Sequence, residues 1–239
     1  MLQGVYSAAT ALETASMNQD LLAENLAHAS TPGYRRQGLI FEVMPPGPDM
    51  APALRNSLGA RLTESYTHFD QGPIQYTGNS LDVALNGDGF FVLEGSDGPV
   101  YTRNGVFEVN AAGELQSKGG MRVQGQGGRI VVPPDAAGIT ITRDGVVLVN
   151  NAEVGRLRVV TFANPQTLRR VGATLFNGQA PQTVAPGAVH FEQGYREGSN
   201  VQVVNEMIAM ILGMRQYEAA DRAMRTLSES MGLNTKPQQ

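Results

Sequence analysis

The chain has 239 residues, enough for one large domain or two smaller units, and its 18 basic and 22 acidic residues give a net charge of −4. Without a broad excess of positive charge to neutralise phosphates, nucleic acid is excluded as an expected partner. The absence of cysteine removes disulfides, thiolate nucleophiles and thiolate metal sites together, while 28 glycines and 13 prolines indicate a turn-rich, mostly β interior.

An N-terminal helix is predicted over residues 1–31, because apolar residues recur at alternating steps of three and four, the spacing of a narrow helical seam. The seam consists of Val5, Ala8, Leu12, Ala15, Gln19, Leu22, Leu26 and Ala29. The S-T-P-G sequence at 30–33 stops this helix, because proline lacks an N–H and pushes the preceding residue out of the helical region. With no basic residue before Arg35 and no long apolar run, the segment predicts no cleaved signal peptide.

Residues 32–79 are predicted to form an extended segment and linker, in which the proline-rich stretch 43–59 is a linker or mobile loop. A central β domain is predicted over 80–198, with a start near 60 as the alternative. Asn-Gly or Asp-Gly dipeptides suited to tight hairpins recur at 86–89, 97–98, 104–105 and 144–145. Strands are predicted between these turns at 81–85, 90–93, 100–102, 106–109, 121–123, 130–132, 139–142, 146–149 and 154–162. This spacing favours an antiparallel, sandwich- or barrel-like domain.

A long C-terminal helix is predicted within 199–239, with Ser199 or Asn200 as its N-cap. Its apolar seam consists of Val203, Met207, Met210, Met214, Tyr217, Ala220, Met224, Leu227 and Met231. Ile208 and Ile211 widen the stripe beyond the area that one partner helix covers, which favours an adaptable intermolecular surface over an ordinary helix face. The predicted fold class is therefore α+β, an all-β central domain whose long N- and C-terminal helices form a coiled-coil-like pair.

Residues for catalysis or metal binding do not stand out in the sequence. Three of the carboxylates Asp82, Asp88, Asp97 and Asp144 lie in Asp-Gly dipeptides, which turn chemistry explains. His28, His68 and His190 follow no metal-ligand spacing. We therefore expect no enzyme activity, no catalytic residue, no cofactor, no metal and no small-molecule substrate.

Three sequence motifs resemble those of bacterial flagellar rod and hook proteins. N-L-A-H-A-S-T-P-G-Y-R at 25–35 is similar to the family's N-L-A-N-x-x-T-x-G-[FY]-[KR] signature, with His28 in place of the usual asparagine. S-L-D-V-A-L-N-G-D-G-F-F at 80–91 and Y-T-R-N-G at 101–105 resemble the family's β-domain core. G-Y-R-E-G-S-N-V at 194–201, followed by M-I-L-G-M-R-Q-Y-E at 210–218, resembles its C-terminal signature.

The resemblance implies an axial subunit whose terminal helices, 1–31 and 199–239, form an inner helical domain and pack with other rod subunits. It also implies export through the flagellar export apparatus without a cleaved signal peptide, and a place in the periplasm-spanning rod of the basal body. Length favours a rod protein over a hook protein, and the proximal-rod F type over the distal-rod G type. The other function left open is a secreted β-domain binding module with helical oligomerisation ends. The expected assembly interface comprises Val5, Leu12, Leu22, Asn25, Leu26, Met207, Ile208, Ile211, Met214, Tyr217, Met224 and Leu227.

Overall fold

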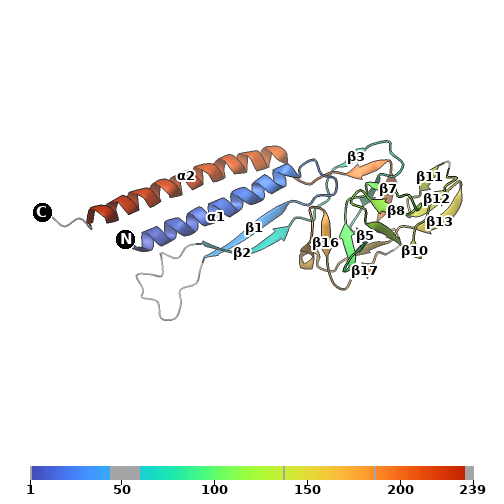
Figure 1. Cartoon of the computed structure of the whole chain (residues 1–239), viewed down its shortest axis with the longest axis horizontal. Helices are drawn as coiled ribbons and strands as arrows, with labels where there is room; N and C mark the ends of the chain where they lie inside the picture. The colour runs from blue at the N-terminus through green and yellow to red at the C-terminus, as the bar shows by residue number, and fades with distance from the viewer. Residues whose placement is uncertain (1, 44–59, 137, 186, 235–239) are drawn as a thin grey trace. The chain divides into compact units, whose positions relative to one another are not determined.

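The computed structural model describes residues 2–43, 60–136, 138–185 and 187–234. Over these residues the chain has one long helix near each end and short antiparallel strands between them (Figure 1). It divides into a helical unit, formed by Met1–Ala27, Gln37–Thr67 and Gln202–Gln239, and a β unit, formed by His28–Arg36 and His68–Val201. None of the helices in the described ranges is both long enough and apolar enough to cross a membrane.

In the helical unit, α1 (Leu2–Ala27) and α2 (Val203–Asn234) lie side by side and run in opposite directions (Figure 1). The antiparallel β1 (Gln37–Val43) and β2 (Ala60–Thr67) form a two-stranded sheet that contacts α1. Strands β1, β2 and β3 (Ile74–Tyr76) thus occupy parts of the stretch predicted as extended segment and linker. The predicted linker at 43–59 lies outside the described residues, apart from Val43 at the end of β1.

Both helices differ from their predicted bounds at the end that adjoins the β unit. The first helix ends at Ala27, before the S-T-P-G stop, because the chain turns where the Thr31 amide donates to the His28 carbonyl at 3.0 Å. Ala29, predicted on the apolar seam, therefore lies outside α1. The second helix begins at Val203, later than Ser199 or Asn200, so neither residue caps it as predicted.

The β unit consists of short antiparallel strands. A ten-stranded sheet has the order β15-β16-β6-β5-β9-β8-β7, with β10 beside β9 and with β14 joining β5 to β17. Three smaller sheets contain β11-β12-β13, β4-β18 and β3-β19. The strands are β3 (Ile74–Tyr76), β4 (Val83–Asn86), β5 (Phe90–Gly95), β6 (Gly98–Thr102), β7 (Phe107–Val109), β8 (Leu115–Ser117), β9 (Arg122–Gly125), β10 (Gly128–Arg129), β11 (Ile139–Ile141), β12 (Val146–Val149), β13 (Ala152–Arg156), β14 (Val159–Thr161), β15 (Arg169–Arg170), β16 (Leu175–Asn177), β17 (Gln182–Thr183), β18 (His190–Gln193) and β19 (Tyr195–Glu197). A single 3-10 turn, η2 (Pro165–Thr167), lies within the described part of this unit.

The core of the β unit lies on both faces of strand β5. Side chains alternate across a strand, so the uninterrupted apolar run F-F-V-L at 90–93 faces two clusters. Phe91 and Leu93 join a cluster with residues of β4, β11, β12 and β18, while Phe90 and Val92 join an aromatic cluster on the opposite face. The small sheets that hold β4, β11, β12 and β18 therefore cover one face of the large sheet, in agreement with the predicted antiparallel packing.

Most predicted strands are confirmed, and two differ from the prediction. The predicted strand at 130–132 is wrong, because only Val131 pairs there, through an isolated bridge to Glu114, and two prolines that cannot donate hydrogen bonds follow at 133 and 134. The predicted strand at 154–162 is divided between β13 and β14. The sequence does not predict the short strands β8, β15, β16, β17, β18 and β19, and the alternating apolar signal over 163–189, where three of them lie, is weak.

Candidate functional site

Small and polar residues take part in the contact between α1 and α2. Gly213 is buried against α1, and a Cβ placed there would lie 3.3 Å from the side-chain amide nitrogen of Gln19. That amide donates to the Met210 carbonyl at 3.3 Å. Leu22 supplies a buried apolar side chain. The helices thus approach closely where α2 has no side chain, a position that the apolar seam of the sequence did not include.

Asn25 fixes the end of α1 to two other segments of the helical unit. Its side-chain oxygen accepts from the Gln37 amide at 2.9 Å, and its amide donates to the Gln37 carbonyl at 2.9 Å and to Glu206 Oε2 at 3.4 Å. Asn25 and Glu206 are both buried. Since Glu206 lies in the first turn of α2, its carboxylate also faces the positive end of the helix dipole.

The structure divides the predicted assembly residues into two groups. Leu22 and Asn25 are buried, and Leu12, Leu26, Met224 and Leu227 are partly buried. Exposed fractions of 44% to 52% are found for the other described side chains, Met207, Ile208, Ile211, Met214 and Tyr217. Val5 lies in α1, and its side chain is outside the described set.

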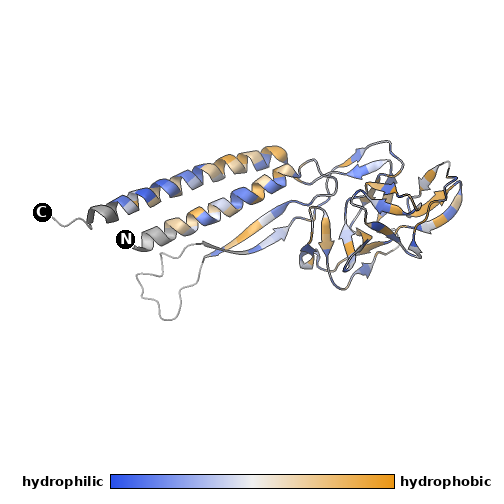
Figure 2. Cartoon of the chain, viewed as in Figure 1, coloured by the Kyte–Doolittle hydropathy of each residue, from blue (hydrophilic) through white to orange (hydrophobic). Residues whose placement is uncertain are grey.

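The exposed group belongs to a larger apolar surface on the first half of α2. We call this the apolar face of α2, and it consists of Val203, Val204, Met207, Ile208, Ile211, Leu212, Met214 and Tyr217. At 3.6 residues per turn, the same side of the helix from residue 215 onward carries the charged residues Arg215, Glu218, Arg222, Arg225 and Glu229. Figure 2 shows this change from hydrophobic to hydrophilic colouring along α2. The boundary between apolar and charged surface therefore lies near the middle of the helix.

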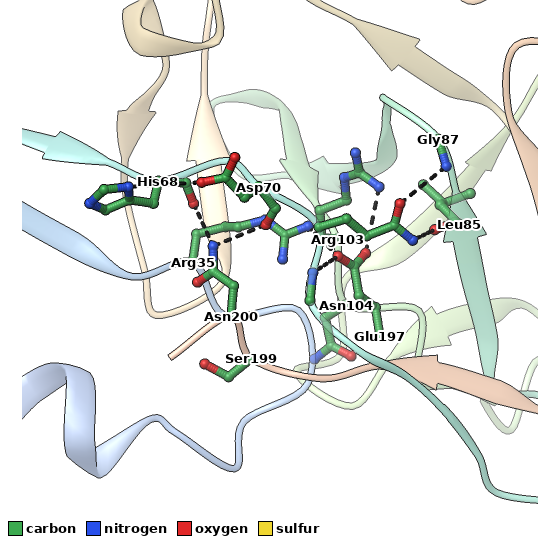
Figure 3. Close-up of polar contacts among 12 residues, drawn as sticks. Arg35, His68, Asp70, Leu85, Gly87, Arg103, Asn104, Glu197, Ser199 and Asn200 are labelled. Atoms are coloured by element: carbon green, nitrogen blue, oxygen red, sulfur yellow. Dashed lines mark hydrogen bonds and ion pairs between the residues drawn. The ribbon is translucent and has the colours of Figure 1, made fainter. Parts of the chain in front are cut away.

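In the β unit, a buried cluster of charged residues joins segments that are distant in sequence (Figure 3). Arg35 Nη2 lies 2.5 Å from Glu197 Oε1, and Arg103 Nη1 lies 3.5 Å from Glu197 Oε2. The Gly72 amide also donates to Glu197 Oε1, at 2.9 Å. All three charged side chains are almost completely buried, so Glu197 offsets the charge of two arginines that water does not reach.

Burial lowers the pKa of Arg103 to about 10, and the opposing effect of Glu197 keeps it from falling further. Arg35 adds to the lowering through its like charge. Arg103 still carries its charge at neutral pH, and its guanidinium lies 5.3 Å from the centre of the Phe90 ring. The cluster is thus a charged, structural part of the β-unit core.

Asn200 holds three backbone segments of the β unit together (Figure 3). Its side-chain oxygen accepts from the Arg36 amide at 2.7 Å. Its side-chain amide donates to the carbonyls of His68 and Asp70, at 2.8 and 3.0 Å. The Asn200 backbone amide bonds to the Tyr34 carbonyl at 3.4 Å. Because these bonds occupy both ends of the carboxamide, Asn200 is a cross-link between segments, which explains why it does not cap α2.

A pocket of about 800 Å³ on the β unit contains arginines but has a structural explanation. It is lined by Thr167, Arg169, Arg170, Val171, Asn177, Gly178 and Gln179. Arg170 donates to the carbonyls of Arg35 and Ala173, and its guanidinium lies over the rings of Tyr34 and Phe176. These contacts assign Arg170 to the packing of the 28–36 segment.

The histidines and aspartates weighed as candidate catalytic or metal-binding residues do not come together in one site within the described ranges. His28 stacks on Tyr34 with 4.9 Å between ring centres and bonds to Thr31, while His68 contacts Arg36. Asp82 is buried and accepts from Asn79 at 3.1 Å. Within the described ranges, no three His, Cys, Asp or Glu residues come together as a possible metal site.

Comparison with known proteins assigns these features to a family. The model described as "Flagellar hook protein FlgE/F/G D1 domain" matches residues 84–149, and "Flagellar basal body rod FlgEFG protein C-terminal" matches 192–233. The chain is 34% identical to the flagellar basal-body rod protein FlgG of Agrobacterium fabrum, over 96% of the chain and 97% of that protein. It is 34% identical to FlgF of Salmonella typhimurium, over 97% and 96%, and 33% identical to FlgF of Caulobacter vibrioides, over 88% and 87%. The chain belongs to the flagellar basal-body rod protein family.

In this rod protein the family-like motifs meet in the buried cluster. Arg35 ends the N-terminal motif, Arg103 lies in Y-T-R-N-G, and Glu197 and Asn200 belong to G-Y-R-E-G-S-N-V. The glycine of the first motif also fits this arrangement, because a Cβ on Gly33 would lie 2.4 Å from the Asn104 nitrogen. Residues from three motifs that are distant in sequence thus come together at one place in the β unit.

Neither the buried charge cluster nor the cross-link made by Asn200 is predicted from the sequence of this rod protein. The available signal was an arginine or glutamate inside each motif, since charged residues are rarely buried unless paired. Periodicity carries no such signal, because the contacts join loops and strand ends.

Proposed function

We propose that this protein is a structural axial subunit of the flagellar basal-body rod that polymerises through its terminal helices and transmits torque. The observation that carries this proposal is the apolar face of α2, whose side chains remain exposed when α1 and α2 are paired. An extended apolar surface with a charged continuation is typical of a protein–protein interface. The twelve predicted assembly residues then act in two ways, some packing within the subunit and others between subunits.

Burial of the apolar face of α2 would favour contact between subunits. Full burial of a large apolar side chain stabilises by about 1.5–3 kcal/mol, so covering a half-exposed one contributes roughly 1 kcal/mol. Eight such side chains together contribute on the order of 8 kcal/mol, which is of the same order as the cost of lost mobility on association. Contacts that repeat without closing into a ring build a helical rod from identical chains.

The proposed location is the periplasm-spanning rod of the basal body, reached through the flagellar export apparatus without a cleaved signal peptide. Family membership supports this location. Neighbouring rod subunits and the export apparatus are the proposed partners.

Within the rod we favour the proximal position over the distal one. The alignment with Agrobacterium FlgG extends over 257 residues while using 96% of a 239-residue chain, so this chain is shorter than that relative in places. The alignment with Caulobacter FlgF uses 88% of the chain over 217 residues and needs fewer gaps. Complementation distinguishes the positions, because a proximal subunit restores motility to a strain lacking FlgF and not to one lacking FlgG.

The assembly surface is tested by Ile211→Asp, with Thr226→Asp as the matched control in the charged half of α2. Ile211→Asp places a charge in the apolar face and is expected to prevent incorporation into purified basal bodies. Thr226→Asp adds the same charge at an exposed position and is expected to be incorporated. Normal incorporation of a folded Ile211→Asp protein would contradict the proposed surface.

A further inference from the structure

The chain passes between the two units four times, between residues 27 and 28, 36 and 37, 67 and 68, and 201 and 202. On the β-unit side, the last three connections end at Arg36, His68 and Val201. The Asn200 side chain bonds to Arg36 and His68, and the His68 amide donates to the Arg36 carbonyl at 2.8 Å. Three connections therefore leave the β unit from neighbouring, hydrogen-bonded positions.

The buried charge cluster holds the same segments a second time. Arg35, adjacent to Arg36, pairs with Glu197, and Gly72, four residues after His68, donates to the same carboxylate. Glu197 and Asn200 lie three residues apart on the third segment. Each of the other two segments is thus attached both to Glu197 and to Asn200.

We propose that Asn200 and Glu197 form a joint that fixes the exits of these connections and through which force passes between the β unit and the helical unit. Asn200 is a positioning residue in this joint, because a carboxamide can accept from one segment and donate twice to another. Alanine cannot do either, and aspartate keeps the acceptor but loses both donors. The force-transmitting role rests on the proposed function as a torque-bearing rod subunit, whereas the joint itself does not.

Hydrogen exchange of the full-length monomer tests the joint. Asn200→Ala and Asn200→Asp are compared with Asn86→Ala, which changes an exposed asparagine at the end of β4. We expect about tenfold faster exchange in peptides covering 34–37 and 68–72 for Asn200→Ala, and a smaller increase near 34–37 for Asn200→Asp. The core peptide covering 90–93 is expected to keep its protection, which shows that the variants fold. Unchanged exchange in the two exit segments would overturn the joint.

Swimming under load tests the force-transmitting role. We expect the Asn200 variants to enter basal bodies but to lose swimming speed several-fold more than wild type when the viscosity of the medium is raised. Asn86→Ala should behave as wild type. Equal speeds for wild type and both variants at high viscosity would overturn the proposed role in force transmission. That result would not contradict the apolar face of α2 as the assembly surface, because the incorporation of Ile211→Asp into basal bodies tests that surface separately.

Discussion

Arg35 and Glu197, 162 positions apart in sequence, form an ion pair in which both side chains are completely buried. The pair connects the segment that follows α1 to strand β19, and Arg103 joins it from the end of β6. Buried ion pairs contribute little net stability compared with apolar packing, but removal of one partner leaves an uncompensated charge. The cluster should therefore be sensitive to substitution on either side.

Glu197→Gln is expected to destabilise the β unit strongly. The variant keeps the shape of the side chain but leaves Arg35 and Arg103 without their counter-charge, at a cost of about 3–5 kcal/mol in the free energy of unfolding. Urea unfolding followed by circular dichroism measures the change. Glu153→Gln, at an exposed position of β13, is the control and should change stability little. A Glu197→Gln protein as stable as the control would show that the cluster is not held by charge.

Asn25→Asp is expected to destabilise the helical unit in a pH-dependent way. The new carboxylate would replace an amide donor that lies 3.4 Å from Glu206 Oε2 and place two negative charges together in a buried site. Stability should be lowest at neutral pH and recover on mild acidification, as one of the two carboxyls takes up a proton. Thermal unfolding over this pH range measures the effect.

Asn25→Ala separates this charge effect from the loss of hydrogen bonds. It also removes the bonds to Gln37 but adds no charge. Its loss of stability relative to wild type should therefore vary much less with pH. Parallel pH profiles for the two variants would argue against charge repulsion.

Gly33→Ala is expected to destabilise the β unit more than the same substitution at a positive-φ glycine that has free space around it. Gly33 has φ +71°, and its added Cβ would meet the Asn104 nitrogen at 2.4 Å and the Arg103 carbonyl carbon at 2.7 Å. Gly120 has φ +78° with no atom within 4 Å of an added Cβ, so Gly120→Ala isolates the conformational strain. That strain alone costs on the order of 1 kcal/mol, and the backbone clash should at least double the loss for Gly33→Ala. Equal unfolding midpoints for the two variants would exclude the clash.

Glu114→Gln is expected to change how stability depends on acid pH. A hydrogen bond from Arg122, with smaller help from Asn110, lowers the pKa of Glu114 below its ordinary value of 4.5, and Arg129 and Glu94 complete this surface cluster. Because the unfolded chain takes up this proton at a higher pH than the folded chain, the stabilisation is present above 4.5 and is lost as the pH falls through the lowered pKa.

The wild-type advantage over Glu114→Gln should therefore be greatest near neutral pH and shrink below 4.5. Urea unfolding at several pH values measures it. Asp97→Asn, in an exposed Asp-Gly turn, should show no comparable trend. A difference that does not vary with pH would contradict the assigned role of Glu114.

The helices and strands with local signals can be predicted from the amino-acid sequence alone. The three- and four-residue apolar steps predicted both helices, and the Asn-Gly and Asp-Gly turns predicted most β-unit strands, because these patterns depend on backbone geometry within a few residues. The apolar residues at 203–217 also marked the surface that remains exposed on α2. The sequence did not distinguish which seam residues face α1, since Gly213 and Glu206 occupy positions where a seam of large apolar residues would be expected.

The contacts among Arg35, Arg103 and Glu197 and the cross-link made by Asn200 are seen in the folded chain but are not indicated by local sequence patterns. Each of these residues lies in a turn, at a strand end or in a connection, where no periodicity indicates the direction of a side chain. Their contacts depend on how the chain returns to the same place after more than 90 residues, and on the cost of burying a charge without a partner. Local patterns therefore predicted the helices and strands, while long-range burial determined the polar joint.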